Sequence, residues 1–313
     1  MDDVSSVSRG CWLLSAWGLV LAGVAFPSMN AHAEGGTVIE ARGEASYTVP
    51  IVVPPGPAGH QPDLALIYNS AEGKGAAGWL GFGWSLAGES RIERDTRTGT
   101  PYDPDNTTCG SDGKTTCYRE VFVLDGQDMI CTGTMCAPCP VGSPSDSCRY
   151  RTQSDDGRFI YYFGETNGWE IQDREGRVLL YGTSAAGRLV NPQISHVFSW
   201  QLESSTDVNG NVISYQYDTT STTNVVYLKK ILYGALTSAD RTVEFVLNDT
   251  SSAPRADHPV NARAGFRQQM DRRVASIEVR ASTSLVTRYV LTYTQDPDSS
   301  RSRLANVQRV GSD

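Results

Sequence analysis

The stretch that decides the fold runs from Tyr47 to Arg94 and reads YTVPIVVPPGPAGHQPDLALIYNSAEGKGAAGWLGFGWSLAGESRIER. Its central residues, Gly73 to Gly78, match the pattern G-x-G-x-x-G and follow an apolar run from Leu64 to Tyr68. That pattern holds a dinucleotide only where the last glycine opens a helix, whose N-terminal amides then bind the pyrophosphate. The residues after Gly78 therefore decide between a nucleotide site and another structure.

A helix directly after Gly78 is disfavoured, because further glycines fall where its first turn would lie. Each interior glycine costs roughly 1 kcal/mol of helix stability relative to alanine. Glycine permits backbone bends and close approaches, and the neighbouring aromatic residues offer apolar surface to pack. We therefore predict a glycine-bent β segment, with Phe82 packed in it and no cofactor. Its structural signature is formed by Gly78, Trp79, Gly81, Gly83 and Trp84.

The N-terminus has the features of an export signal. Cys11 to Phe26 is mostly apolar, Pro27 ends the run, and Ala31-His32-Ala33 forms an A-x-A cleavage pattern. The run is shorter than the ~20 residues of a membrane-spanning helix, so no stable membrane span is expected. These features predict a signal peptide at residues 1–33, cleavage after Ala33 and a secreted or extracellular protein. The alternative is a retained N-terminal anchor helix.

The charge of the chain argues against a nucleic-acid partner. The 313 residues include 27 basic and 35 acidic side chains, for a formal net charge of −8. Basic residues are spread along the chain, whereas a nucleic-acid-binding surface concentrates them. No nucleic-acid partner is therefore expected.

Six cysteines remain after the expected cleavage, and all lie in one short part of the chain: Cys109, Cys117, Cys131, Cys136, Cys139 and Cys148. An even number of cysteines in an exported protein favours disulfides, and six allow 15 pairings among which the sequence does not choose. Zinc is the alternative, because Cys131-x4-Cys136-x2-Cys139 has a ligand-like spacing. We predict disulfides and no metal site.

The rest of the sequence predicts an all-β fold, a succession of antiparallel hairpins that forms a large curved sheet. Runs rich in Val, Ile, Tyr, Phe and Thr alternate with Gly, Asn and Asp at hairpin spacing. Asn209-Gly210 suits a type I′ turn, and residues 262–274 are the one stretch that also suits a short helix. The expected strands are residues 120–124, 158–163, 169–172, 177–181, 225–233, 242–247, 276–280, 287–294 and 304–310.

Three zones are expected after the signal. Residues 34–98 are punctuated by Pro and Gly, residues 99–149 form a cysteine-rich insertion, and residues 150–313 are the hairpin-rich remainder. Residues 304–310 still have the pattern of a strand, and Gly311-Ser312-Asp313 provides no closing cap. Because an uncovered sheet edge promotes aggregation, we expect the chain to be truncated or the first module of a longer protein.

With these residues in place, the chain resembles the N-terminal domain of SpvB-like proteins. That domain is shared with the B component (TcdB/TcaC) of Tc insecticidal toxins and is allied to Rhs-repeat proteins. The cysteine-rich zone and the signal peptide depart from the family pattern. The matching residues include Gly43-Glu44-Ala45, Tyr47–Ile51, Pro54-Pro55-Gly56, Tyr68-Asn69-Ser70, Gly78–Trp84, Ile92-Glu93-Arg94, Phe122–Gly126, Trp200-Gln201-Leu202, Asp207–Asn211, Tyr215-Gln216-Tyr217 and Ile231–Gly234.

The resemblance implies an exported, non-catalytic structural module of a toxin or virulence protein. In Tc toxins this domain forms part of a β-sheet shell that encloses a toxic C-terminal polypeptide, and in SpvB the toxic activity lies in a separate C-terminal domain. The implied partners are downstream propeller or Rhs-type segments of the same or a partner chain, and a host-cell surface. Relatives exported by other routes leave a cytoplasmic location open. The alternative function is an adhesin-like surface domain that binds a host receptor or glycan.

No catalytic constellation is apparent in the residues. Ser282-Thr283-Ser284 is similar to the S-T-S element of ADP-ribosyltransferases, but no glutamate follows Glu278. His60, His196 and His258 are scattered, and none lies near a G-x-S-x-G motif. We therefore predict that the chain is not an enzyme, and that the serines form a polar strand or turn.

Two further groups of residues suggest binding sites. Asp103-Pro104-Asp105-Asn106 and Asp296-Pro297-Asp298 offer oxygen ligands to calcium, but neither has an EF-hand loop, and such clusters are mostly turns. The aromatic candidates for a sugar-binding face are Tyr161, Tyr162, Tyr215 and Tyr217. Tyrosines in strands are more commonly cross-strand pairs that stabilise the sheet.

Overall fold

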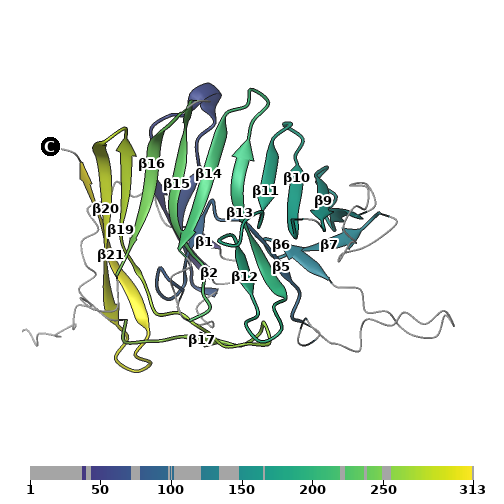
Figure 1. Ribbon diagram of the computed structural model, residues 1–313. Helices are drawn as coiled ribbons and strands as arrows, with labels where there is room; N and C mark the ends of the chain where they lie inside the picture. The colour runs from purple at the N-terminus through teal and green to yellow at the C-terminus, as the bar shows by residue number, and fades with distance from the viewer. Residues whose placement is uncertain are drawn as a thin grey trace, which may run out of the picture.

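The computed structural model consists almost entirely of strands, and this confirms the all-β prediction (Figure 1). Among the residues that the structure describes, the one named helical element is a short 3-10 turn, η1 (Pro57–Gly59). No helix in the described part of the chain is long and apolar enough to cross a membrane. The structure describes residues 37–39, 44–71, 78–97, 99, 101, 121–133, 148–164, 166–218, 223–235, 238–248 and 255–311.

The largest sheet has fifteen strands and includes all nine strands expected from the sequence, with shifts of a few residues at their ends. Neighbouring strands are antiparallel, in the order β11-β10-β9-β8-β7-β6-β5-β13-β14-β15-β16-β19-β20-β21, and β12 also pairs with β13. The strands are β5 (Arg91–Arg94), β6 (Phe122–Leu124), β7 (Gln127–Cys131), β8 (Arg149–Thr152), β9 (Phe159–Phe163), β10 (Gly168–Gln172), β11 (Val178–Tyr181), β12 (Arg188–Val190), β13 (Val197–Thr206), β14 (Val212–Asp218), β15 (Tyr227–Ala235), β16 (Ser238–Leu247), β19 (Val274–Ala281), β20 (Ser284–Gln295) and β21 (Ser302–Gly311).

Part of this sheet closes into a ring, because β11 pairs with β13 as well as with β10. The branch is β13: residues 199–201 pair with β5, and residues 204–206 pair with both β11 and β14. From β14 to β21 the sheet then continues as one antiparallel array, on the left of Figure 1. Along β20 the alternate residues Thr287, Tyr289 and Leu291 are buried, as expected for a strand with one face toward the core.

A second, four-stranded sheet packs against the long sheet and contains β1 (Thr37–Ile39), β2 (Glu44–Ile51), β3 (Leu64–Asn69) and β4 (Trp84–Ala87). In Figure 1 these strands lie behind β14 and β15. The Tyr289 hydroxyl accepts a hydrogen bond from the amide of Val52 (2.9 Å), and the Tyr233 hydroxyl donates to the Pro54 carbonyl (2.8 Å). Apolar residues of both sheets share one hydrophobic core.

Aromatic side chains from four strands of the ring pack edge to face. The Trp169 ring centroid lies 4.9 Å from that of Phe122, 5.2 Å from Tyr150 and 5.8 Å from Trp200. Each of these contacts contributes about 0.5–1.5 kcal/mol beyond the burial of area. The ring is therefore held by its side chains as well as by its backbone hydrogen bonds.

The helix considered for residues 262–274 is wrong. The segment lies largely in a hairpin of β17 (Val260–Asn261) and β18 (Gln268–Gln269). Gly265 has a φ of +79°, and its amide donates to the Ala262 carbonyl (3.0 Å), so a turn forms. Phe266 is buried against Phe198 of β13, a long-range contact that helical periodicity does not reveal.

The type I′ turn expected at Asn209-Gly210 is also wrong. The loop between β13 and β14 is longer, and Gly210 has a φ of +80° whereas Asn209 keeps a negative φ. The Asp207 carboxylate accepts hydrogen bonds from the amides of Asn209 (2.9 Å) and Asn211 (2.8 Å). Because aspartate caps the loop in this way, the chain does not need the two-residue turn.

Candidate functional site

The signature residues form a compact turn ahead of β4. Gly78 and Gly81 make an isolated bridge, and β4 begins only at Trp84. Gly81 and Gly83 have φ values of +91° and +75°, which side chains with a Cβ rarely adopt. Residues 79–83 therefore form no helix N-terminus for a pyrophosphate, and residues 72–77 of the glycine pattern lie outside the described residues.

The turn is docked onto the far end of the chain. The amide of Phe82 donates to the carbonyl of Ser302 (2.9 Å), at the start of β21, and the amide of Val274 donates to the carbonyl of Trp79 (3.0 Å). A Cβ on Gly81 would lie 3.1 Å from the nitrogen of Leu304. The glycine thus allows β21 to approach the turn closely.

The aromatic residues of the turn pack as partly buried side chains. Trp79 lies 5.5 Å from Phe245, and Trp84 lies 5.5 Å from Tyr68, measured between ring centroids. The side chain that is fully buried is Leu80, which sequence reasoning did not single out. Phe82 lies under the guanidinium of Arg301 at 5.0 Å.

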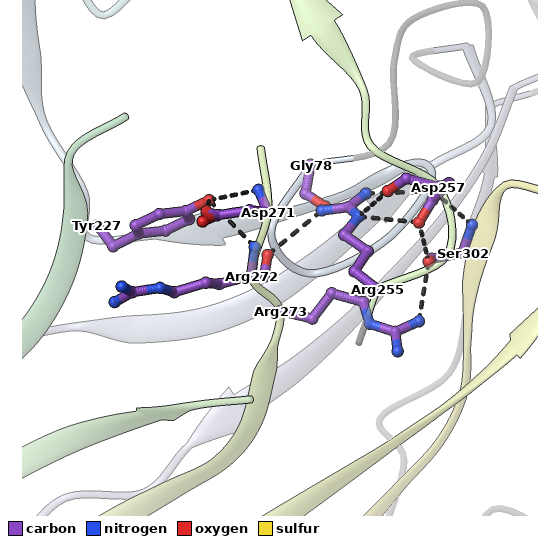
Figure 2. Close-up of polar contacts among 8 residues, drawn as sticks. All are labelled: Gly78, Tyr227, Arg255, Asp257, Asp271, Arg272, Arg273 and Ser302. Atoms are coloured by element: carbon purple, nitrogen blue, oxygen red, sulfur yellow. Dashed lines mark hydrogen bonds and ion pairs between the residues drawn. The ribbon is translucent and has the colours of Figure 1, made fainter. Parts of the chain in front are cut away.

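A buried ion pair fastens this turn to the long sheet (Figure 2). Arg255 is only 2% exposed, and its Nε donates to Asp257 Oδ1 at 2.8 Å. Its Nη1 donates to the carbonyl of Gly78 (2.9 Å) and, more weakly, to that of Arg272 (3.3 Å). Asp257 in turn accepts from the amide of Ser302 (2.7 Å) and from its hydroxyl. The pair of Arg255 and Asp257 therefore joins three segments that are distant along the chain, at Gly78, Arg272 and Ser302.

The electrostatics of this network keep Asp257 ionised. Burial alone would raise its pKa, but the hydrogen bonds from Arg255 and Ser302 outweigh burial and hold the pKa below its usual range. Arg273 donates to the Ser302 hydroxyl (2.9 Å) and lies 4.8 Å from the centroid of the Tyr293 ring. Burial lowers the pKa of Arg273.

An adjoining set of hydrogen bonds holds the segment before β19. The Tyr227 hydroxyl accepts from the amides of Asp271 (3.0 Å) and Arg272 (3.2 Å) and donates to Asp271 Oδ1 (2.9 Å) (Figure 2). Ser302 next to Asp257 offers no reactive nucleophile, because Ser302 is fully buried and its hydroxyl is bonded on both sides. The arrangement clamps the backbone.

The histidines lie on three separate segments. His60 follows η1 and is buried, with its Nε2 3.0 Å from the carbonyl of Ser205 on β13. His196 and His258 are exposed. Among the described residues, no group of three or more His, Cys, Asp or Glu side chains is placed to hold a metal ion.

The serine and aspartate motifs form turns. Ser282 has a φ of +52° and lies in the hairpin between β19 and β20, where Ala281 pairs with Ser284. Asp296 Oδ1 accepts from the amides of Asp298 (3.0 Å) and Ser299 (2.8 Å), so its carboxylate is used within the turn. Residues 103–106 lie outside the described residues.

The four tyrosines do not share an exposed face. Tyr162 and Tyr215 are buried, and the Tyr162 hydroxyl donates to Asn167 Oδ1 (2.9 Å). The Tyr217 hydroxyl donates to the carbonyl of Leu202 (2.5 Å). Tyr161 is half-buried and lies on the other face of β9 from Tyr162. These contacts are those of sheet residues that stabilise strand pairing.

The structure describes two of the six cysteines, Cys131 and Cys148. Cys131 ends β7 and Cys148 precedes β8, and both are disulfide-bonded. Cys109, Cys117, Cys136 and Cys139 lie outside the described residues. The pairing of the six cysteines, and the zinc alternative, therefore stay predictions.

Comparisons with known proteins agree with this fold. The family model described as "Salmonella virulence plasmid 65kDa B protein", SpvB, matches residues 39–256. Proteins named mono(ADP-ribosyl)transferase SpvB from Salmonella choleraesuis and Salmonella typhimurium are 34% identical over 220 residues, which are 63% of this chain and 36% of theirs. The chain thus spans about a third of the length of these relatives.

Two kinds of solved structure share the fold. The N-terminal domain of the effector SpvB from Salmonella typhimurium has a TM-score of 0.61 at 23% identity, over 85% of this chain and 100% of that one. The crystal structure of TcdB2-TccC3 has a TM-score of 0.68 at 20% identity, over 94% of this chain and 17% of that one. Together with the family match, these findings confirm the resemblance seen in the sequence: the chain belongs to the SpvB family.

Proposed function

We propose that this chain is an exported, non-catalytic structural module of a bacterial toxin or virulence protein, and that it forms part of a β-sheet shell which houses or delivers a toxic C-terminal polypeptide. The observation that carries the proposal is the continuous fifteen-stranded sheet. Pairing along such a sheet satisfies the backbone amides and carbonyls of its interior strands, so a wall can extend without exposing them. The family match supports a toxin-related role.

The edge of the sheet at β21 suits a partner strand. Within the described residues β21 pairs only with β20, and residues 308–311 are exposed. A strand edge of this kind is a template for another strand. We assign this edge to a propeller or Rhs-type segment of the same or a partner toxin chain, and the likeness to TcdB2-TccC3 supports such an assembly.

The proposal assigns no chemistry to this chain. Its relatives are named mono(ADP-ribosyl)transferases, and the chain spans only about a third of their length. The buried Ser302 has a hydroxyl that is bonded on both sides, and Ser282 lies in a turn. Incubation of this chain with labelled NAD⁺ and a cell lysate should transfer no label to protein, whereas a labelled protein would show that the chain itself is an enzyme.

Export is part of the proposal. N-terminal sequencing of the exported protein should begin at Glu34 if the signal is cleaved after Ala33. An intact Met1 in the membrane fraction would instead favour the anchor helix.

Limited proteolysis of the full-length protein tests the shell. The toxic polypeptide should resist protease in the wild type and be digested sooner in Tyr233→Phe/Tyr289→Phe, which removes both hydroxyls that join the two sheets. Val208→Ala, at a side chain 72% exposed, serves as the control. Equal digestion of the polypeptide in the wild type and the double variant would contradict enclosure by this wall.

A further inference from the structure

A pocket of about 280 Å³ lies between the ring, the signature turn and the hairpin of β17 and β18. The hairpin lies at the lower end of the long sheet (Figure 1). The volume of the pocket is near the lower end of the range for ligand sites, ~300 Å³, so the pocket suits one small molecule rather than an extended chain. Two residues considered from the sequence line it: Trp79 of the signature and Tyr217, one of the four tyrosines considered for a sugar-binding face.

One wall of the pocket presents the carboxylate of Glu89, which interacts electrostatically with Arg91. Glu89 lies between β4 and β5, where Gly88 bends the chain with a φ of +92°. A Cβ on Gly88 would lie 2.4 Å from the carbonyl of Asp63, so this bend needs glycine. Glu89 is exposed to the pocket, and its carboxylate accepts no hydrogen bond from any described residue.

The lining also presents a buried amide donor with no acceptor among the described residues. The backbone of Gln268 pairs with Asn261 in the hairpin, and its side chain lines the pocket. Its Nε2 is buried and has no hydrogen-bond partner among the described residues. An unsatisfied buried donor costs about 1–3 kcal/mol, a cost that a ligand oxygen would remove.

The rest of the lining combines aromatic, polar and charged side chains, and its formal charges balance. Trp79, Phe198 and Tyr227 provide aromatic surface. The charged residues of the lining are two acids and two bases, namely Glu89, Glu93, Arg91 and Arg263. Arg91 pairs with Glu93 at 2.9 Å, and Arg263 donates to Thr96 at 3.2 Å. With no net formal charge, the lining does not select an ionic ligand.

We propose that this pocket binds one neutral pyranose sugar unit. A sugar hydroxyl both donates and accepts, so one ligand can donate to Glu89 and accept from Gln268. The apolar C–H face of a pyranose would pack on the aromatic surface. The pocket lies apart from the open edge of β21, so the sugar site does not depend on a role in a shell.

Titration of the full-length protein with methyl glucoside, methyl galactoside and methyl mannoside, followed by calorimetry or ligand-observed NMR, tests the site. At least one glycoside should bind with a Kd of roughly 1–10 mM, as few contacts are available. Glu89→Ala should weaken that binding by about tenfold, because it removes a hydrogen bond to a charged group. Gln268→Leu should weaken it to a similar extent.

Glu175→Ala, at an exposed position between β10 and β11, is the matched control and should bind as the wild type does. Failure of all three glycosides to bind, or unchanged affinity in Glu89→Ala, would overturn the proposal. Stronger binding of glucosamine or glucuronate than of the neutral glycosides would overturn it too. Glu89→Ala decides the outcome even where Gln268→Leu fails to fold, because Glu89 is exposed.

Discussion

Replacement of Arg255 by methionine tests whether the buried ion pair holds the signature turn. Methionine fills much of the same volume but carries no charge and no donor. The substitution leaves the carboxylate of Asp257 without its guanidinium and removes a donor from the carbonyls of Gly78 and Arg272. Asp257 keeps only the amide and the hydroxyl of Ser302 as donors.

The expected loss follows from these contacts. Removal of one partner of a buried ion pair costs about 3–5 kcal/mol, because a charge stays buried without compensation. The remaining donors from Ser302 place Arg255→Met at the lower end, about 3 kcal/mol in the free energy of unfolding. At about 2–4 °C per kcal/mol for a protein of this size, Tm should fall by roughly 6–12 °C.

Urea unfolding followed by tryptophan fluorescence measures the effect. Arg255→Met/Asp257→Leu should lose less stability than the two single variants added together, by at least ~1 kcal/mol, because no unpaired carboxylate remains. Arg151→Met, which breaks an exposed pair with Asp155 at 3.3 Å, should cost under ~1 kcal/mol. If Arg255→Met unfolds within ~0.5 kcal/mol of the wild type, the clamp contributes little and the reasoning fails.

The same pair makes a prediction about pH. The pKa of Asp257 is lower in the folded protein, so its contribution to stability is present above the unfolded pKa of about 3.9 and is lost as pH falls through the folded value. The difference in stability between the wild type and Arg255→Met should therefore shrink in acid. A difference that stays constant from neutral pH into acid would exclude the ionised pair as its source.

Three further predictions concern the turn and the junction that follows it. Leu80→Ala should cost about 2–5 kcal/mol and Phe82→Ala distinctly less, because only Leu80 is fully buried; equal shifts in urea midpoint would contradict this order. Gly88→Ala should destabilise more than Gly126→Ala in thermal unfolding: both have positive φ, but only Gly88 has backbone atoms against an added Cβ. The Glu89 side chain is exposed to the pocket, but the surrounding protein desolvates its carboxylate and raises its pKa to about 7, so its ionisation disfavours the folded state as pH rises from 4.5 toward 7. Glu89→Gln should thus gain stability relative to the wild type at about pH 8 and not at about pH 5, by an amount that pocket water keeps small.

The local part of the fold was predictable because its causes are local. Alternating apolar residues with turn residues between them predicted strands such as β9 and β20. The same rules failed at Asn209-Gly210, where the carboxylate of Asp207 caps a longer loop. They failed again before β19, where Phe266 is buried against Phe198. In both cases a side-chain contact outweighed the preference of the backbone.

Ring closure and the buried network were not predictable in this way. β11 meets β13 through pairings such as Tyr181 with Leu202, and no local pattern states which strands meet. Arg255 and Asp257 have the appearance of two surface charges in the sequence, separated by Ala256. Their role depends on Gly78 and Ser302, which are distant along the chain.

The glycines of the signature turn belong both to a local sequence motif and to a long-range contact. Gly81 is required because β21 approaches it closely: an added Cβ would lie 3.1 Å from the nitrogen of Leu304. The amide of Phe82 donates to the carbonyl of Ser302. The motif that makes the sequence recognisable is therefore a long-range contact surface rather than an independent local unit. Such a turn gains its hydrogen bonds only when the last strand of the sheet has docked, and closing so long a loop costs chain entropy in advance. The signature should accordingly form late in folding, together with β21 and the Arg255 clamp.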